Sequence, residues 1–297
     1  MIDIIGRRKI WYSISAAVLI PGLVLLGVFG LELGIDFTGG SNITVETELE
    51  EAEVRELVEA EGVTEPTLLP TDAGYQIRFT EDIDIEAELA AADGVAVERF
   101  ERVGPSVSQD LVYNALWSLL AVSLAITIFV AFAFRKVQHP FRFGAMAITA
   151  LLHDGLFVLV MFALFGALFG VEVDAFIVTA ILTVIGFSVH DTIVVFDRIR
   201  ENLLRRSGEF ADIVNASVNE VMGRSLNTSI TTVLVLLALF LFGGQGTVTF
   251  ILALLLGMVA GTYSSLFIAS PLLVTWFQRR GEQPAAEESV ANSETVR

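Results

Sequence analysis

The chain has 297 residues, 54% of them hydrophobic, and a mean hydropathy of +0.69, which is typical of a membrane protein. It contains no cysteine, which excludes disulfides, cysteine zinc sites and thiol catalysis. The net charge is −17, but residues 32–108 hold 20 Asp and Glu against four Arg, so the acidity belongs to one segment. Such a surface favours solubility and excludes nucleic acid as its partner.

The first predicted span lies within residues 1–31. Three bases, Arg7, Arg8 and Lys9, precede an apolar run from Ile10 to Leu31, which as a helix would extend roughly 33 Å. This run is longer than the core of a signal peptide and does not end in a small-residue cleavage site. We therefore expect an uncleaved transmembrane helix whose basic flank stays in the cytoplasm.

Residues 32–108 are predicted to form a folded extracytoplasmic domain. They open with a glycine-rich motif, in which we single out Gly34, Asp36, Gly39 and Gly40. The hydrophobic pattern then alternates between the period of a strand and that of a helix, in the order strand, helix, strand, strand, helix, strand. This order is that of the ferredoxin-like split βαβ unit.

Residues 109–277 are predicted to add five membrane helices. The expected spans are Leu111–Phe134, Phe143–Phe169, Ala175–Phe196, Ser225–Phe242 and Thr247–Phe277. Within residues 198–224 the apolar positions recur at three and four, which predicts an amphipathic cytoplasmic link along the membrane surface or under the bundle. Residues 278–297 are polar and are predicted to form a disordered cytoplasmic tail. The fold class is therefore an α-helical membrane protein, with six transmembrane helices and one extracytoplasmic α+β ferredoxin-like domain between spans 1 and 2.

The distribution of bases gives the orientation. Thirteen Lys and Arg residues of the membrane part fall on one side of the six spans, whereas the short outer loops 170–174 and 243–246 carry none. Since basic loops stay in the cytoplasm, we expect both termini there and a multi-pass protein of the cytoplasmic membrane.

The fourth span carries the strongest functional candidate. Asp191 lies inside an otherwise uncharged run, where a carboxylate costs at least about 2.5–3.5 kcal/mol, so it should face protein or water. Its neighbour His190 points about 100° away on a helix, and is either a second proton carrier or a packed side chain. Asp197 and Arg198 mark the exit into water, where Asp197 and Arg200 are spaced to pair.

Two further polar sites lie in the spans. Asp154, next to His153 in the third span, is either a relay group or an acid that serves helix packing. At the start of the fifth span, one helical face carries a polar stripe of Arg224, Asn227, Thr228, Thr231 and Thr232. This stripe either holds helices together or, with Asp191 across the bundle, lines a hydrated path for protons.

Several chemistries have no motif in the chain. The sequence has no Walker glycine loop, HExxH or GxSxG, so we expect no enzyme activity, no metal site and no cofactor. Energy then enters as ion flow, with H⁺ as the expected coupling ion and Na⁺ as the alternative, because a carboxylate with hydroxyls serves either.

Five blocks of residues together resemble the SecF family of the protein-export machinery, within the resistance-nodulation-division superfamily. They are the Gly34–Gly40 motif, the Val103-Gly104-Pro105 junction, Leu152–Gly155, Gly186–Asn202 and Arg224–Ser229. The pattern departs from the family at Phe187 and His190, where Tyr and Asn are usual, and at Ser108, where Gly is common. His190 beside the acid therefore leaves the pH range of this chain open.

The resemblance implies a function and partners. SecF is expected to pair with SecD and with the SecYEG channel, in the lipid bilayer, and to use the proton motive force for the late translocation of a preprotein. Asp191 and Arg224 carry over as the residues of the proton path. The resemblance leaves open whether the external domain binds the preprotein directly.

Two rival functions remain at this stage. A proton-coupled exporter of small molecules or lipids would belong to the same superfamily, but such exporters usually carry two six-span halves and two large external domains. A membrane scaffold without transport has no need for Asp191 or for the stripe that begins at Arg224. Recovery together with SecD and the channel would favour protein export over both.

Overall fold

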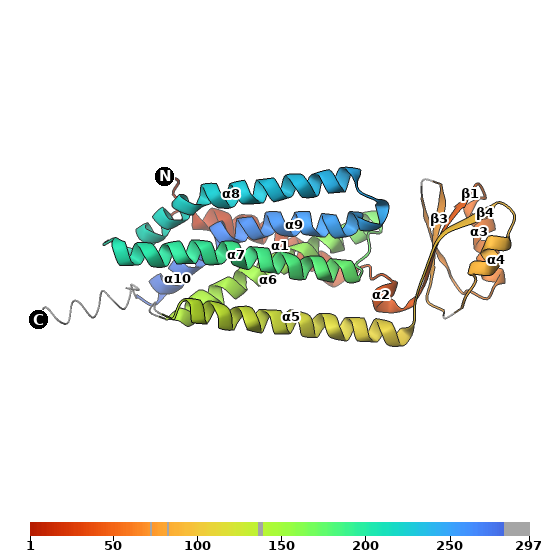
Figure 1. Ribbon diagram of the computed structural model, residues 1–297, viewed down its shortest axis with the longest axis horizontal. Helices are drawn as coiled ribbons and strands as arrows, with labels where there is room; N and C mark the ends of the chain where they lie inside the picture. Colours follow the sequence, from red (N-terminus) through yellow and green to blue (C-terminus); the bar gives the residue numbers. More distant parts are fainter. Residues whose placement is uncertain (72, 82, 136–138, 282–297) are drawn as a thin grey trace, which may run out of the picture. The chain divides into compact units, whose positions relative to one another are not determined.

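The computed structural model describes residues 1–71, 73–81, 83–135 and 139–281. These residues form two compact units, one of 1–32, 118–172 and 176–281 and one of 33–117 and 173–175, and each is described by itself (Figure 1). The predicted disordered tail, 278–297, falls outside the described residues beyond position 281. The helical unit is considered first.

Six helical spans are confirmed, each long and apolar enough to cross a bilayer among the residues described. Five are single helices: α1 (Arg8–Phe29), α5 (Pro105–Ala133), α6 (Pro140–Phe169), α7 (Ala175–Arg205) and α8 (Phe210–Phe242). The sixth comprises α9 (Val248–Ser264), the π-helix η2 (Ser265–Ala269) and α10 (Ser270–Arg279), and follows the short 3₁₀ turn η1 (Gln245–Thr247). The chain is thus a multi-pass membrane protein.

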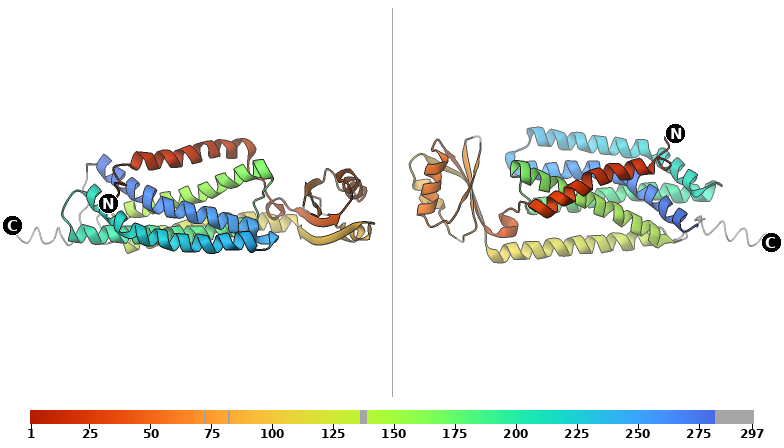
Figure 2. Two further views of the ribbon diagram at one scale, coloured as in Figure 1. Left: turned by 90° about the horizontal axis from the view of Figure 1, so that it is seen from above. Right: turned by 180° about the vertical axis from the view of Figure 1, so that it is seen from behind.

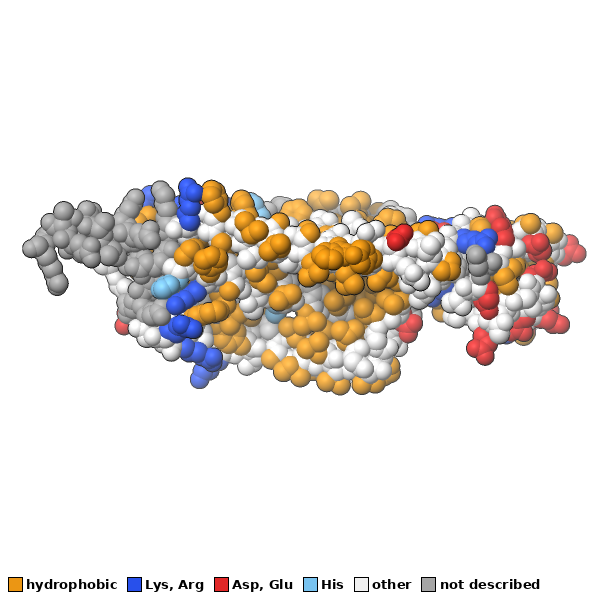
Figure 3. Space-filling view, turned by 90° about the horizontal axis from the view of Figure 1, so that it is seen from below, with side chains coloured by type: hydrophobic (Ala, Val, Ile, Leu, Met, Phe, Trp, Pro, Cys, Tyr) orange, Lys and Arg blue, Asp and Glu red, His pale blue; other side chains and the backbone are white. Residues whose placement is uncertain are grey.

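The bundle packs around its sixth span. The views from above and from behind show α1 beside α6, and α9 between α6 and α8 (Figure 2). A large buried cluster joins the ends of α5, α6, α7 and α8 to η2 and α10, with Phe134, Phe143, Phe196 and Phe277 almost fully buried. The outer surface of the helices is covered by exposed hydrophobic side chains, as expected for contact with lipid (Figure 3).

The predicted cytoplasmic link is not a separate helix. Its apolar residues belong to α8, which runs without a break from Phe210 through the fifth span. Their side chains lie in the bundle core, so the amphipathic face packs under the bundle rather than along a membrane surface. The N-terminal residues dock there too, because the Asn215 side chain accepts hydrogen bonds from the amides of Ile4 and Ile5, at 2.9 and 3.2 Å.

The sheet-containing unit has the predicted ferredoxin-like order. After a one-turn helix α2 (Ile35–Thr38) come β1 (Gly40–Thr47), α3 (Glu51–Ala60), β2 (Thr67–Pro70), β3 (Gly74–Phe79), α4 (Glu86–Ala91) and β4 (Val95–Val103). The strands form one antiparallel sheet in the order β2-β3-β1-β4. Alternate residues of β1 and β3, including Ile43, Val45 and Ile77, pack beneath α3 and α4, while acidic side chains cover much of the surface of this unit (Figure 3).

The glycine-rich motif forms a strained turn and a helix cap. Gly39 and Gly40 have φ of 75° and 116°, and a Cβ on Gly40 would lie 2.2 Å from the Phe79 carbonyl oxygen, so only glycine fits. Asp36 Oδ2 accepts a hydrogen bond of 2.8 Å from the amide of Ala175, the first residue of α7. The motif therefore caps the helix that carries Asp191.

Two glycines let α7 and α9 approach closely. A Cβ on Gly257 would lie 2.3 Å from Val184 Cγ2, and one on Gly261 would lie 3.0 Å from Ser188 Cβ. Gly257 and Gly261 are four residues apart on α9, which is the small-xxx-small spacing of membrane helix contacts.

Replacing Gly257 tests this contact. We expect Gly257→Ala to destabilise the bundle by about 1–3 kcal/mol, because the new methyl group has no room against Val184. Thermal unfolding in detergent would then show a lower midpoint. Gly223→Ala on α8 is the matched control, because nothing lies within 4 Å of its added Cβ and alanine favours a helix. Equal midpoints for the two variants would contradict the packing.

Replacing Asp36 tests the cap. In Asp36→Ala we expect the Ala175 amide to exchange its hydrogen roughly fivefold faster, because losing a cap costs about 1 kcal/mol. Hydrogen exchange of a peptide covering the start of α7 measures this directly. Asp36→Asn retains an oxygen that can accept the bond, so its exchange should stay near that of the unaltered chain. Similar exchange in the Ala and Asn variants would rule out the cap.

Candidate functional site

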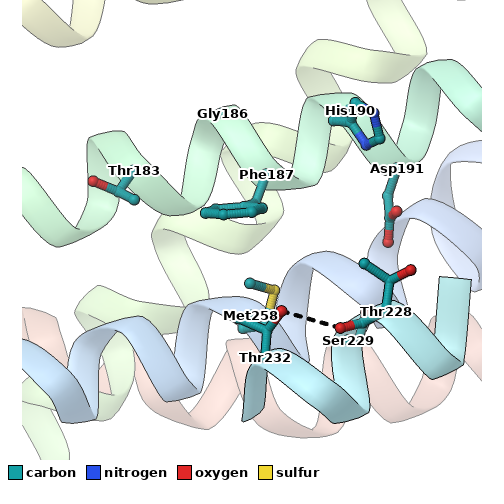
Figure 4. A pocket seen from close by; sticks show the side chains of 9 residues that line it. All are labelled: Thr183, Gly186, Phe187, His190, Asp191, Thr228, Ser229, Thr232 and Met258. Carbon is teal, nitrogen blue, oxygen red and sulfur yellow. Dashed lines mark hydrogen bonds between the residues drawn. The ribbon is translucent and has the colours of Figure 1, made fainter. Parts of the chain in front are cut away.

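The membrane bundle contains a pocket between α7 and α8 that is lined by both apolar surface and polar side chains. It has a volume of about 430 Å³ and is lined by Thr183, Gly186, Phe187, His190, Asp191, Thr228, Ser229, Thr232 and Met258. The first five come from α7, the next three from α8, and Met258 from α9 (Figure 4). The structure thus brings three of the predicted site residues, Asp191, His190 and Thr228, to one cavity.

Asp191 points from α7 toward Thr228 and Ser229 on α8 (Figure 4). Its side chain is half-buried, so it is neither sealed in the core nor fully exposed. The buried Ser225 hydroxyl also interacts with it, although without normal hydrogen-bond geometry. A carboxyl with so few fixed partners, beside a cavity large enough for water, is chemically able to take up and release a cation.

The predicted stripe is present on α8, but only two of its members, Thr228 and Thr232, line the pocket. The side chains of Arg224 and Asn227 are exposed and do not line the pocket. The Thr228 hydroxyl donates to the Arg224 carbonyl at 3.0 Å, and that of Thr232 donates to the Thr228 carbonyl at 3.0 Å. Among the described residues, Arg224 makes no ion pair with Asp191 or with another acid. The structure therefore does not join the two residues that the resemblance links.

Asp154 belongs to a second, closed site. Its side chain is fully buried and accepts hydrogen bonds on Oδ2 from Ser188 on α7, at 2.5 Å, and from Ser264 on α9, at 2.8 Å. Its other oxygen, Oδ1, lies 3.0 Å from His153 Nδ1. Three helices thus hold this acid, whereas the pocket beside Asp191 is open.

The π-helix η2 lies next to this closed site. Ser264 ends α9 and bonds Asp154, while Ser265 donates to the Ser188 carbonyl at 3.2 Å and pairs with the Thr192 hydroxyl at 2.8 Å. The two consecutive serines thus bond two different helices, Ser264 to α6 and Ser265 to α7, at the point where the π-helix begins. Serines 188 and 264 were missed as site residues, and the only signal for them was their hydroxyls within otherwise apolar spans.

The motif at the end of α7 is an ionic cluster. The predicted pair of Asp197 and Arg200 is confirmed at 3.1 Å. Arg198 bonds Glu201 of its own helix and Glu220 of α8, each at 2.5 Å. These residues tie α7 to α8 beyond the pocket and do not contact either buried acid. No cluster of three potential metal ligands is present within the described ranges.

Comparison with known proteins places the chain in a family. Residues 84–279 match the family described as protein export membrane protein SecD/SecF, C-terminal, and residues 24–48 match the SecD/SecF GG motif. Protein translocase subunit SecF of Thermobaculum terrenum is 46% identical over 93% of this chain and 94% of its own length. The subunit of the same name from Anaerolinea thermophila is 40% identical, over 96% of this chain and its own full length.

A solved structure agrees with these sequence matches. The crystal structure of SecDF, a translocon-associated membrane protein from Thermus thermophilus, has a TM-score of 0.81 to this chain and is 30% identical to it. The match covers 93% of this chain and 39% of that longer one. The GG-motif match includes the turn that caps α7, and the larger match includes both membrane acids. The chain belongs to the SecF family of protein translocase subunits.

Proposed function

We propose that this protein, with a SecD subunit, uses inward proton flow to drive late preprotein translocation through the SecYEG channel. The observation that carries the proposal is the half-buried carboxyl of Asp191, in a pocket within the membrane helices that His190, Thr228 and Ser229 also line. A charge that crosses 100 mV gains roughly 2.3 kcal/mol, so several protons supply substantial mechanical work. Asp191 is the group that takes up and releases each proton.

The need for a second subunit follows from the exposed face of α7 and α8. His190, Arg224 and Asn227 lie on the surface of this chain at membrane-spanning helices. Polar groups at that depth are costly against lipid, so another protein surface should cover them. The chain corresponds to 39% of the single-chain SecDF of Bacillus subtilis, which is consistent with the missing part being SecD. In that assembly Arg224 would approach Asp191 by movement of α8.

The proposed orientation places both termini in the cytoplasm and the sheet domain on the far side. The bases on the helix ends and connecting loops support it, because basic segments stay in the cytoplasm. The domain lies between spans 1 and 2 and would move the preprotein when the membrane helices change shape. The chain would act without a bound cofactor and without catalysing a covalent reaction.

The experiment is export of a preprotein into inverted membrane vesicles that contain SecYEG and SecD. With an imposed proton gradient, we expect Asp191→Asn to reduce export to the rate measured without a gradient, because asparagine cannot exchange a proton at this site. Asp197→Asn is the matched control: the same change in the same helix, at a half-exposed ionic cluster, should leave export close to normal. Full gradient-driven export by Asp191→Asn would reject the proposal.

Two further arms separate the alternatives. Replacing the proton gradient by a sodium gradient tests Na⁺ as the coupling ion, and stimulation by sodium alone would reject H⁺. A small-molecule exporter of the same superfamily would be isolated without SecD and would not support export of preprotein. Recovery of this chain together with SecD and the channel, with export restored, supports the translocase.

A further inference from the structure

The closed site around Asp154 lies outside the pocket proposed for proton exchange. The carboxyl is fully buried, the His153 side chain is 10% exposed, and neither residue lines the cavity beside Asp191. Within the described part of the chain, no Lys or Arg bonds either residue. Such a buried acid needs its charge balanced within the site, because an isolated carboxylate in an apolar interior costs several kcal/mol.

A chain of hydrogen bonds runs from this site to α1. The Tyr263 hydroxyl on α9 donates to the Trp11 carbonyl at 2.6 Å. The Ser15 hydroxyl on α1 donates to the Tyr263 oxygen over a long 3.4 Å, and Ser15 Oγ lies 2.9 Å from His153 Nε2. The site is thereby tied to a helix that does not itself contribute a group to Asp154.

The donor and acceptor roles in these hydrogen bonds assign a proton to one nitrogen of His153. Tyr263 has a single hydroxyl proton and uses it on Trp11, so it can only accept from Ser15. Ser15 also has one proton, which goes to Tyr263, so Ser15 must accept from His153. The Nε2 atom therefore carries a hydrogen, as assigned from the network of bonds.

The other nitrogen fixes the proton count of the pair. A hydrogen bond between His153 Nδ1 and Asp154 Oδ1 needs one proton between them. If the proton is on Nδ1, the pair is imidazolium and carboxylate; if it is on Oδ1, both groups are neutral. The Ser188 hydroxyl donates to Oδ2 at 2.5 Å, which places the shared proton on the Oδ1 side, between Asp154 and His153. In either form the pair holds two protons and has no net charge.

Release of one proton has a defined consequence. The remaining proton stays on Nδ1, where it faces the carboxylate, and Nε2 becomes an acceptor. Ser15 then turns its hydroxyl from Tyr263 to His153, and the bond from α1 to Tyr263 is lost. The groups that face the pair are Ser15 from α1, Ser188 from α7, and Ser264 and Tyr263 from α9, so Tyr263 is the one other titratable group in contact with this network among those described.

We propose that His153 and Asp154 form a second proton-exchange site, and that its occupancy sets the direction of the Ser15 hydroxyl between α1 and α9. The place of this site in transport rests on the proposed function, whereas its proton count does not. The adjacent π-helix η2 follows Ser264 directly, so a change at the pair acts where the sixth span departs from regular α-helical geometry.

The test is nitrogen NMR of the full chain in lipid bilayers with ¹⁵N-labelled histidine. The chain has three histidines, and His139→Gln and His190→Gln identify the signals of the other two by their loss, leaving those of His153. We expect a proton on Nε2 at the acid end of the pH range over which the protein stays folded, and its loss to the Nδ1–H form at the alkaline end. A signal that stays in either form over this whole range would overturn the proposal.

Three variants sharpen the test. In Asp154→Asn the amide can donate to Nδ1, so His153 should stay in its Nε2–H form at every pH; continued titration between the two forms would contradict the shared proton. Tyr263→Phe removes the acceptor of Ser15 only from the proton-loaded form, so the midpoint should fall by about 0.5–1 pH unit. Tyr12→Phe is the matched control. It removes a tyrosine hydroxyl on α1 that bonds Thr275 at 3.1 Å, outside this series, and should leave the midpoint unchanged. Equal midpoints in the two tyrosine variants would exclude the hydrogen-bonded series from His153 through Ser15 to Tyr263.

The result is separable from the proposed function. If Asp191→Asn retains gradient-driven export, the proposed function fails, while the His153 titration in that same variant still reports on the second site. If His153 is fixed in one form and Asp191→Asn abolishes export, the second site fails and the translocase proposal stands.

Discussion

The close approach of α7 and α9 is the constraint on which the membrane sites depend. Gly257 and Gly261 remove the side chains that would separate the two helices, and Ser188 occupies the space opposite Gly261. That position lets the Ser188 hydroxyl reach Asp154 on α6, so one glycine contact also completes the shell of a buried acid. This contact is important in a bilayer for two reasons. Helices there gain little from hydrophobic burial against one another, so close packing must hold them together, and buried polar groups have no water to bond.

The two membrane acids, Asp154 on α6 and Asp191 on α7, have different surroundings. Asp154 is fully buried and has three fixed partners, Ser188, Ser264 and His153. Asp191, three residues beyond Ser188, is half-buried beside an open pocket and has one weak partner in Ser225. The two acids therefore differ in solvent access and in the number of groups that hold the carboxyl in place. Helix α7 carries Asp191 and also contributes Ser188 to the site of Asp154, so any rotation or shift of α7 affects both sites.

Most of the fold was predictable because its signals are local. The length of each apolar run, the side on which the bases lie, and the switch between strand and helix periods gave six spans and the sheet order. The continuity of α8 was not predictable, because an amphipathic segment that leads into a span has the same pattern whether it lies along a membrane or under a bundle. Phe210 and Val214 show the second case, being buried in the core of the bundle.

The acidic residues of the site could be predicted from the sequence, but the residues that bond them could not. A lone carboxylate such as Asp191 stands out in an apolar run, whereas Ser188 and Ser264 are ordinary residues of membrane helices until tertiary contacts bring them to Asp154. The helical spacing put Arg224 and Thr228 on one face, but only the packing of α7 on α8 decides that Thr228 reaches the pocket and Arg224 does not. The π-helix has no sequence signal that periodicity detects.

Asp36 extends this dependence on α7 to the glycine motif. Its carboxylate caps the first residue of α7, and the Gly34 amide donates to the Val173 carbonyl at 2.9 Å just before that helix begins. Gly39 and Gly40 then turn the chain directly into β1, so little slack remains between the cap and the sheet. The cap and the strand are therefore joined by hydrogen bonds and a few covalent links rather than by a flexible linker. This accounts for the glycine and aspartate residues of the motif, which lie far in sequence from both membrane acids.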